Sequence, residues 1–564
     1  MDRKEIKETP VWLLYEKGRN FHRQMGVYTD TDRNYRFYNG NQWEGANLAD
    51  IEPVQKNFIR PIVKYKTSVI HSNLYALHFS SQNYENPIFQ RESERYCKIL
   101  NGYVSRIWEK DKMDKKGRQI TKDAAINGEG ILYVTYDKEK QMPLNEVVDK
   151  TDVYYGNENT EDIQSQPYIL IRRRMPVVNA IELALSEGMD ESNSNNIIGD
   201  NDTFEQSGDA SKYEVDNAVT VIYKLYKEKG TVHYSIATKW QTIVEGEDTG
   251  LSLYPVAHFT WEEKKGSARG EGEVRCLIPN QIEVNKNEVR RVLAVKHQAF
   301  PKTMYNSSLI TNPEDLNRVG VAIEVNGVID DIRKAIGTLP PAQMSSDVKQ
   351  LHDDLIQITR DLAGAGEVAT GSVNPETASG KAILAVQRAS QAPVNEQKEG
   401  YKSFLEDVGN IWMEYLMVHS EDGIKMPEKI VDRQGKETYQ IVVIPQSALK
   451  KLQASVNIDV TPKSVFDKLA QEQTIEALLM GGFLTPQRVN ELKAYAEVLD
   501  DDSTAPKIKI LELVDKVYQT QQQIAKINSE AQMMMQRAEH FLTSDIDSQA
   551  QQIADAKMKL AQTR

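Results

Sequence analysis

The sequence predicts an α+β protein that is predominantly α-helical, with helical segments toward both ends and a β-rich region between them. Apolar residues recur at helical spacing over long stretches, whereas the centre is rich in β-branched and aromatic residues bounded by turn residues. Of the 564 residues, 40% are hydrophobic and 27% are charged, which is the composition of a folded globular protein. Because no run approaches the roughly 18 apolar residues that span a bilayer, we expect no membrane segment.

The first part of the chain, from about Pro10 to Thr135, is predicted to be mostly helical. An aromatic cluster, Tyr35–Trp43, lies between the first two helices and ends in a turn signal. Packing between helices explains this cluster better than base stacking, because few basic residues are interleaved. The helices are expected at Trp12–Gly26, Pro61–Leu77, Arg91–Asp111 and Lys115–Asn127.

A β-rich region follows these helices. Its last two strands are predicted to form a hairpin around Lys229 and Gly230. The segment Glu187–Asp216 is polar and acidic, which is typical of a long surface loop or a disordered insertion. The strands are expected at Gly130–Tyr136, Pro167–Arg174, Ala218–Tyr226 and Thr231–Val244.

Two long helices enclose a small α/β insertion, Tyr305–Thr338, that glycines and prolines punctuate. Pro279 is expected in the first turn of the first helix, which ends before Pro301. The second helix is predicted at Asp347–Leu362, and its apolar residues form one narrow stripe, which suits a seam against neighbouring helices. The stripe consists of Val348, Leu351, Leu355, Ile358 and Leu362.

A glycine-studded loop, Gly364–Thr377, follows the second helix and offers no large side chain to bury. A long helix is expected from about Pro375 to His419, with Asn374 as its cap. Pro393 is predicted to kink this helix. A rigid helix, a mobile loop and a second long helix suit the lining of an opening better than a catalytic pocket. Below the kink, a broad apolar face is formed by Phe404, Val408, Ile411, Trp412, Tyr415 and Leu416.

The C-terminal part contains two strand candidates, Gln440–Ile444 and Ser455–Val460, and is predicted to be helical from Lys463 onward. The last stretch, Lys507–Arg564, is rich in Gln, Ala and Met. Its Gln-rich end supports one alternative function, an oligomeric helical scaffold or adaptor of a capsid or another large assembly.

The formal net charge of −13 argues against a tight nucleic-acid binder, which usually carries a basic stripe. Nucleic acid could still be cargo, because a conduit that must not grip a moving polyanion needs weakly interacting walls. Basic residues do gather on the Pro279–Ala299 helix. They form either a solvated, salt-bridged face or a contact with Asp353, Asp354 and Asp361 of this or another copy. This basic face consists of Lys286, Arg290, Arg291 and Lys296, with His297 nearby.

No catalytic residue, metal site or cofactor is predicted. The segment near Gly371 lacks Walker A spacing, because Ala382 follows Lys381 where Ser or Thr is required. The nine histidines are scattered without ligand spacing, and residues such as His297 and His352 are expected on helix surfaces or interfaces.

The two cysteines, Cys97 and Cys276, lie far apart in the sequence and are expected to be buried thiols of a protein in a reducing compartment. The acidic loops do not fit the calcium-loop pattern. They nevertheless motivate a third hypothesis, an enzyme with an unrecognised metal site that includes Asp200 and Asp202. We expect no metal-dependent hydrolysis from these residues.

Four segments, taken in order, resemble the portal proteins of tailed bacteriophages, and the resemblance covers roughly residues 10–470. The third segment is similar to the one that leads into the first stem helix of a portal, and the fourth to the element after its tunnel loop. The four segments are Tyr35–Trp43, Asn57–Val69, Gly270–Asn285 and Thr377–Ile383.

This resemblance implies a non-enzymatic ring, usually of twelve copies, at one vertex of a capsid. Its expected cargo is double-stranded DNA, contacted without sequence specificity and pumped by a separate terminase motor. The further implied partners are neck or adaptor proteins, the major capsid protein and scaffolding proteins. The protein would reside at the portal vertex of the virion and in the host cytoplasm during assembly.

Carried over by position, the resemblance also implies a division of the chain. The wing would be residues 1–278, the stem helices 279–299 and 347–363, the clip 300–346, the tunnel loop 364–377, the long kinked helix and wing return 378–469, and the crown with a helical tail 470–564. The tunnel loop would present little positive charge to DNA, so contact there would be steric and transient. Its DNA-facing residues would be Gly364, Gly366, Glu367, Thr370, Gly371, Ser372 and Asn374.

Overall fold

The computed structural model divides into two units, Met1–Thr461 and Pro462–Arg564. In the second unit, residues 526–537 and 546–559 are helical, as predicted for the tail. No helix in the described ranges is long and apolar enough to cross a membrane. The structure describes residues 8–46, 52–81, 87–200, 217–299, 302–318, 320–327, 335–339, 346–365, 392–421, 423–431, 437–451, 454–462, 524, 526–537 and 546–559.

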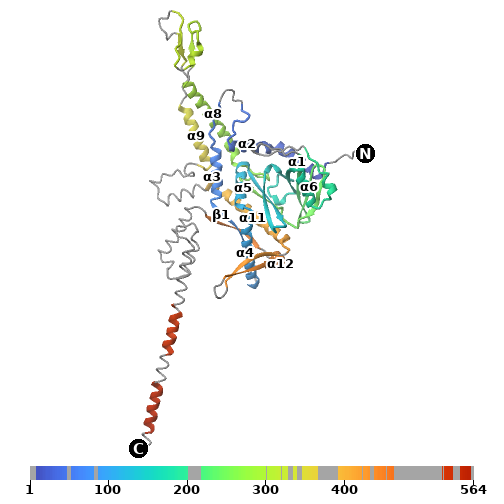
Figure 1. Ribbon diagram of the computed structural model, residues 1–564, viewed down its shortest axis with the longest axis vertical. Helices are drawn as coiled ribbons and strands as arrows, with labels where there is room; N and C mark the ends of the chain where they lie inside the picture. The colour runs from blue at the N-terminus through green and yellow to red at the C-terminus, as the bar shows by residue number, and fades with distance from the viewer. Residues whose placement is uncertain are drawn as a thin grey trace. The chain divides into compact units, whose positions relative to one another are not determined.

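The N-terminal part of the first unit is helical, as predicted (Figure 1). The aromatic segment Tyr35–Trp43 packs between helices, as expected, with Phe37 and Tyr38 buried in the core. Most of it belongs to a helix that the sequence did not predict. The helices are α1 (Pro10–Gln24), α2 (Val27–Asn39), α3 (Ile59–Ile70), α4 (Pro87–Lys110) and α5 (Met113–Asn127).

The predicted helix Pro61–Leu77 is wrong in its last residues, which begin strand β1 (Asn73–Ser81). Tyr75, Leu77 and Phe79 are buried there, whereas the residues between them face outward or are less buried. An alternation with period two buries one face of a strand, and a helix of this sequence could not bury the same three side chains.

Two antiparallel sheets form the β-rich region. One has the strand order β3-β2-β9 and the other β4-β5-β6-β7-β8. The predicted hairpin is confirmed at β6 and β7, where Lys229 and Gly230 both have positive φ, as a tight two-residue turn requires. The predicted second arm is split into β7 and β8. The strands are β2 (Glu129–Asp137), β3 (Met142–Val148), β4 (Val153–Tyr155), β5 (Tyr168–Pro176), β6 (Ala218–Glu228), β7 (Thr231–Ala237), β8 (Thr242–Asp248) and β9 (Val256–Thr260).

Helix α1 packs on the five-stranded sheet through Trp12 and Tyr15, which meet Tyr154 and Leu170. Two short helices, α6 (Val177–Ser186) and α7 (Glu191–Ser194), follow β5. Helix α7 therefore lies within the segment predicted to be a loop, and its buried Ser194 shows that this part is folded against the body.

The first long helix, α8 (Glu273–Ala299), begins six residues earlier than predicted, so Pro279 lies inside it and not in its first turn. Proline disfavours a helix interior but does not prevent one when tertiary contacts stabilise the preceding turn. Here Val274, Leu277 and Ile278 are buried in the core and hold that turn.

The second long helix, α9 (Ser346–Leu362), agrees with the prediction to one residue. The insertion between α8 and α9 contains β10 (Thr303–Tyr305), which pairs antiparallel with β11 (Ile336–Thr338), and the 3₁₀ turn η3 (Pro313–Asn317). The strands of the predicted insertion are therefore present, and its described residues contain a 3₁₀ turn where an α-helix was expected.

Pro393 does not kink a continuous helix in the described part of the chain. It lies in a 3₁₀ turn, η5 (Ala392–Val394), and helix α11 (Asn395–His419) begins directly after it. This follows from proline chemistry, because a proline at the start of a helix loses no hydrogen bond. The predicted apolar face of α11 is confirmed, since Phe404, Trp412 and the other four residues are buried.

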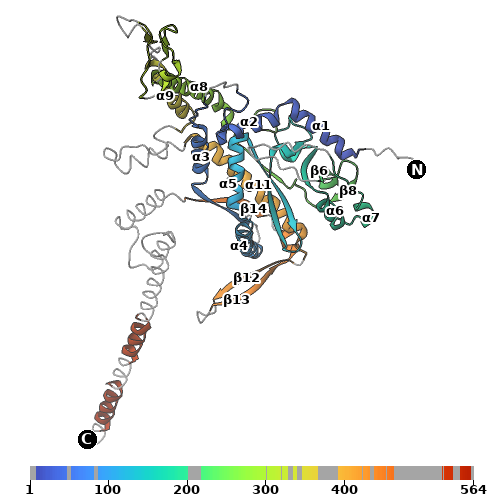
Figure 2. The ribbon, with the colours of Figure 1, turned by 45° about the horizontal axis from the view of Figure 1, so that its top comes forward.

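The remaining predicted strands are confirmed. A two-stranded hairpin, β12 and β13, extends beyond α11, and β14 pairs with β1 (Figure 2). The bounds are β12 (Ile424–Val431), β13 (Glu437–Ile444), α12 (Gln446–Lys451) and β14 (Ala454–Pro462).

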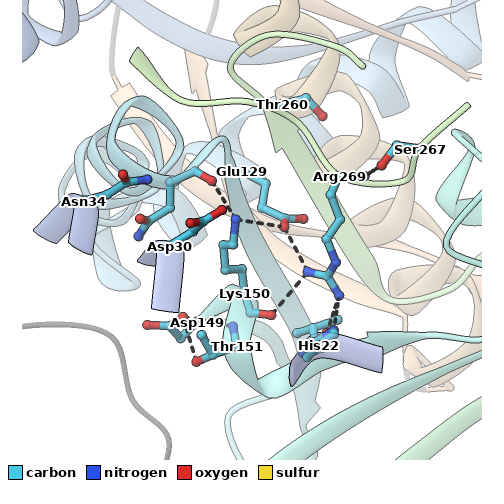
Figure 3. A network of polar contacts seen from close by, with 12 residues as sticks. His22, Asp30, Asn34, Glu129, Asp149, Lys150, Thr151, Thr260, Ser267 and Arg269 are labelled. Carbon is cyan, nitrogen blue, oxygen red and sulfur yellow. Dashed lines mark hydrogen bonds and ion pairs between the residues drawn. The ribbon is translucent and has the colours of Figure 1, made fainter. Parts of the chain in front are cut away.

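A buried guanidinium, that of Arg269, joins the sheets to α1 just before α8 begins (Figure 3). It donates to Glu129 at 2.9 Å and makes two bonds to Glu158, each also of 2.9 Å. It further donates to the carbonyl of Val153 and to Nε2 of His22, both at 2.8 Å. The planar fork of arginine is suited to this many acceptors at fixed angles.

The charges in this network balance one another. Burial by itself would raise the pKa of Glu129, but Arg269, His258 and Lys150 hold it well below its usual range. Burial and the neighbouring Arg269 lower the pKa of His22 to about 4, so its ring is neutral and can accept from the guanidinium. The network is fully ionised at Arg269 and Glu129 and neutral at His22.

We predict that Arg269→Met destabilises the protein by about 3–5 kcal/mol, because it leaves the buried Glu129 and the partly buried Glu158 without their main counter-charge. Urea unfolding measures this difference. The matched control is Arg275→Met, since Arg275 is 58% exposed and its ion pairs with described residues are long, 3.7 Å to Asp30 and 3.6 Å to Glu271. That change should cost less than about 1 kcal/mol, and equal costs at the two positions would contradict the assignment.

Candidate functional site

The residues singled out by the sequence gather on α8, α9 and the junction between α9 and α11. Helix α8 is anchored at its first residue, where Glu273 forms a buried ion pair of 2.7 Å with Lys66 of α3. The indole N–H of Trp261 donates to the same carboxylate at 3.3 Å. A buried pair with an additional donor fixes the direction in which α8 leaves the body.

One polar face of α8 binds the segment 52–58 that precedes α3. Gln281 accepts from the N–H of Phe58 at 3.0 Å and donates to the carbonyl of Lys56 at 2.8 Å. One turn later, Asn285 donates to Gln42 at 2.6 Å, and Glu288 then pairs with the Lys56 ammonium at 3.1 Å. The spacing 281, 285 and 288 places these three side chains on one side of the helix. Sequence reasoning missed this face, because polar residues at helical spacing look like a solvated surface.

Helix α9 packs against α8 through its polar side and not through its apolar stripe. His352 and Thr359 are buried there, seven residues apart on α9. Thr359 accepts from Asn280 at 2.9 Å, and His352 lies 3.5 Å from the Glu288 carboxylate. His352 is therefore an interface residue, as expected, and His297 is exposed on α8.

The apolar stripe of α9 is left largely uncovered within the chain. Leu351 is 53% exposed, Ile358 55% and Leu362 81%. Val348 and Leu355 are half-buried. A line of large apolar side chains on a rigid helix is unusual on a free surface and marks a surface for association.

Three of the four residues of the basic face of α8 form ion pairs within the chain. Lys286 pairs with Glu283 at 2.7 Å and Arg291 with Glu288 at 3.0 Å, while Arg290 donates to Asn287 at 2.8 Å. Lys296 pairs with Glu52 at 3.2 Å. None of these described cations pairs with Asp353, Asp354 or Asp361, so the salt-bridged alternative is the one observed in the single chain.

Helix α9 ends in a glycine turn that brings the two ends of the following segment together. Gly364 has φ of +67°, its N–H donates to Asp361 at 3.0 Å, and the N–H of Ala365 donates to Arg360 at 2.8 Å. These bonds form a Schellman motif. A Cβ on Gly364 would lie 2.7 Å from Cβ of Pro393, so Gly364 and Pro393 are in contact.

Residues 366–391 lie outside the described residues. Of the proposed DNA-facing positions, Gly364 is half-buried at this junction. The other six lie outside the described residues: Gly366, Glu367, Thr370, Gly371, Ser372 and Asn374.

The residues behind the enzyme hypothesis have structural roles where they are described. Asp200 pairs with the Arg174 guanidinium at 2.7 Å and accepts from the N–H of Thr220 at 2.7 Å, and Asp202 lies outside the described residues. In the described part of the chain, no group of three or more His, Cys, Asp or Glu residues could hold a metal ion. Cys97 is buried as expected, but Cys276 is exposed, because α8 turns its neighbours Val274 and Leu277 toward the core instead.

The comparison with protein families decides between the remaining hypotheses. The family model described as phage P22-like portal protein matches residues 19–564. The chain belongs to this portal protein family. A search of curated proteins finds no match.

Membership gives the protein a structural, non-enzymatic role and implies a place at the capsid vertex of the virion. It also implies a ring and interactions with DNA and the capsid. The resemblance seen in the sequence is thereby confirmed, and it extends beyond residue 470 to the end of the chain.

We predict that Gly364→Ala destabilises this portal protein more than Gly188→Ala does. Gly188 ends α6 in the same hydrogen-bond motif, with φ of +86°, but nothing lies within 4 Å of the place that a Cβ would take there. Both changes carry the backbone strain of a left-handed alanine, about 1–2 kcal/mol, and only Gly364→Ala adds a clash. Urea unfolding measures both. The double change Gly364→Ala with Pro393→Gly, which removes the clashing Cβ, should cost less than the sum of the two single changes, and a strictly additive pair would argue against the contact.

Proposed function

We propose that this portal protein forms a closed ring of about twelve copies, through which DNA enters and leaves one vertex of the capsid. The observation that carries the proposal is the exposed apolar stripe of α9, on a helix whose other side is fixed to α8. Such a stripe needs a partner, and a neighbouring copy of the same helix pair supplies one in a ring.

Each part of the proposed ring has support in the described residues. The pair of α8 and α9 would form the stem, with α8 held at its base by Glu273 and Lys66. The β10–β11 insertion would be the clip, which would dock the terminase during packaging and neck or adaptor proteins afterward. The body of helices and sheets would be the wing, and the C-terminal unit would be the crown and tail, which faces the capsid and any scaffolding proteins.

The segment 364–377 is proposed as the tunnel loop. Its support is the glycine turn that ends α9, where Gly364, the first residue of the loop, contacts Pro393 at the base of the proposed stem. A loop anchored at its first residue can change shape while the stem keeps its packing, as a moving DNA cargo requires. The contact with DNA would be steric and without base readout.

The ring itself is tested by the mass of the purified assembly together with low-resolution images. A closed, perforated particle of about twelve copies supports the proposal. A monomer, a coiled-coil dimer or a solid particle contradicts it and favours the scaffold or adaptor alternative.

We predict that Ile358→Glu shifts the assembly toward smaller species, because it would bury a charge without a partner between copies. The unfolding midpoint of the dissociated subunit should stay nearly unchanged, since Ile358 is 55% exposed within the chain. The control is Gln357→Glu, which adds the same charge at the next, exposed position of α9. Mass photometry over a range of concentrations measures both. If the two variants assemble alike, the stripe is not a seam.

Deleting Gly366–Ser372 should leave ring assembly intact and impair the packaging or retention of DNA, because the described helices α9 and α11 keep their contacts. The control deletion, Thr203–Asp209, removes the same number of residues from the polar insertion. The measurement is DNA protected from nuclease in a packaging reaction. Collapse of the ring, with normal packaging by any rings that remain, would show that the loop is misplaced.

A further inference from the structure

A cavity of about 190 Å³ lies away from the stem residues, between α4, the turn joining β2 to β3 and the turn joining α11 to β12. It shares no lining residue with α8, α9 or the junction at Gly364. Figures 1 and 2 both show α4 beside the β12–β13 hairpin in this part of the first unit, and the two elements are in contact.

The lining of this cavity is basic, although the chain as a whole is acidic, with a net charge of −13. Four cationic side chains line it, and none of its lining residues is an aspartate or glutamate. The four are Arg106, Lys110, Lys140 and Lys425.

A second cavity, beside Arg269, differs from this one because carboxylates of the chain lie among its cations. It is also lined by several cations, but Asp30, Glu158 and Glu271 lie among them. Arg269 itself is saturated by its bonds to Glu129 and Glu158. The cavity next to α4 lacks such internal compensation.

Three of the four cations have no carboxylate partner in the described ranges of the chain. Lys140 pairs with Asp137 at 2.8 Å, whereas Arg106, Lys110 and Lys425 form no ion pair there. Arg106 and Lys110 are four residues apart on α4, so they lie on the same face of the helix. Like charges held on one face repel each other, and a bound anion relieves that cost.

The walls of the cavity are fixed, which separates it from a chance group of surface lysines. The Tyr103 hydroxyl donates to the carbonyl of Gln141 at 2.5 Å and so joins α4 to the β2–β3 turn. On the other side, Gly423 has φ of +74° and its N–H donates to Ser420 at 3.0 Å. A Cβ on Gly423 would lie 2.5 Å from the carbonyl oxygen of Ile444, so this turn accepts only glycine without rearranging.

We propose that this cavity binds a phosphate-type oxyanion, either inorganic phosphate or a phosphodiester of DNA that lies against the outside of the subunit. A guanidinium can donate two parallel bonds to phosphate oxygens, and the lysines supply point charges around them. A volume of about 190 Å³ accommodates one such group. The site is distinct from the proposed channel, so the inference does not depend on the ring.

The test compares two triple variants of the full-length protein. The cavity variant is Arg106→Gln, Lys110→Gln and Lys425→Gln. The control variant is Lys64→Gln, Lys98→Gln and Lys115→Gln, which removes the same charge from exposed positions outside the cavity. Thermal unfolding should show both to be folded, since every substituted side chain is exposed.

The first arm titrates inorganic phosphate by calorimetry at constant ionic strength. The second measures a short DNA duplex by fluorescence anisotropy over a range of salt concentrations. A loss of tenfold or more in affinity that only the cavity variant shows supports the proposal. If the duplex arm shows that loss and a shallower salt dependence, the source is the DNA backbone. If only the phosphate arm shows it, the source is free phosphate. Equal behaviour of the two variants in both arms, or no binding of either probe by the unmodified protein, overturns the proposal.

Discussion

The constraint on which the first unit depends is that Glu129 is buried and Glu158 nearly so, and that one guanidinium is the main counter-charge of both carboxylates. Arg269 reaches both carboxylates, His22 and a carbonyl at the start of β4, so a single side chain fixes the relative positions of α1 and two sheets. Four residues later α8 begins. There the buried ion pair of Lys66 with Glu273 likewise fixes the position of the helix. Buried ion pairs are weak evidence for stability, but they specify geometry well when every donor is satisfied.

This geometry makes α8 and α9 a rigid pair of helices, with the apolar stripe of α9 largely exposed. The part of α8 up to Val289 is buried in the body, and α9 is fastened beside it by Thr359 and His352. On the apolar side of α9, Leu355 packs against the core, whereas Leu351, Ile358 and Leu362 remain exposed within the described part of the chain. In a member of a ring-forming family, this arrangement allows contacts within a subunit and contacts between subunits to use different faces of the same helix.

The cations of α8 and those beside α4 differ in whether they have charged partners within the described residues. Lys286, Arg291 and Lys296 of α8 pair with carboxylates on their own helix or with Glu52, and Arg290 donates to the neutral Asn287. This pairing suits the proposed stem, which must not hold a polyanion. The cations beside α4 lack such neighbours within the described residues. Net charge therefore says little about where an acidic protein can meet an anion, since local compensation decides it.

The sequence by itself determined the α+β class, most of the long helices and strands, the β6–β7 hairpin and the family resemblance. These features rest on local periodicity, turn chemistry and motif order, which need no knowledge of distant contacts. The tertiary structure decided the rest. Tertiary contacts start α8 at Glu273 and make residues 73–81 a strand. They also place Pro393 at the start of a helix, in contact with Gly364. The tertiary structure also turned the polar side of α9 inward, because Asn280 and Glu288 offered partners that no local pattern reveals. Which face of a helix is covered depends on what lies opposite, and only the folded chain supplies that.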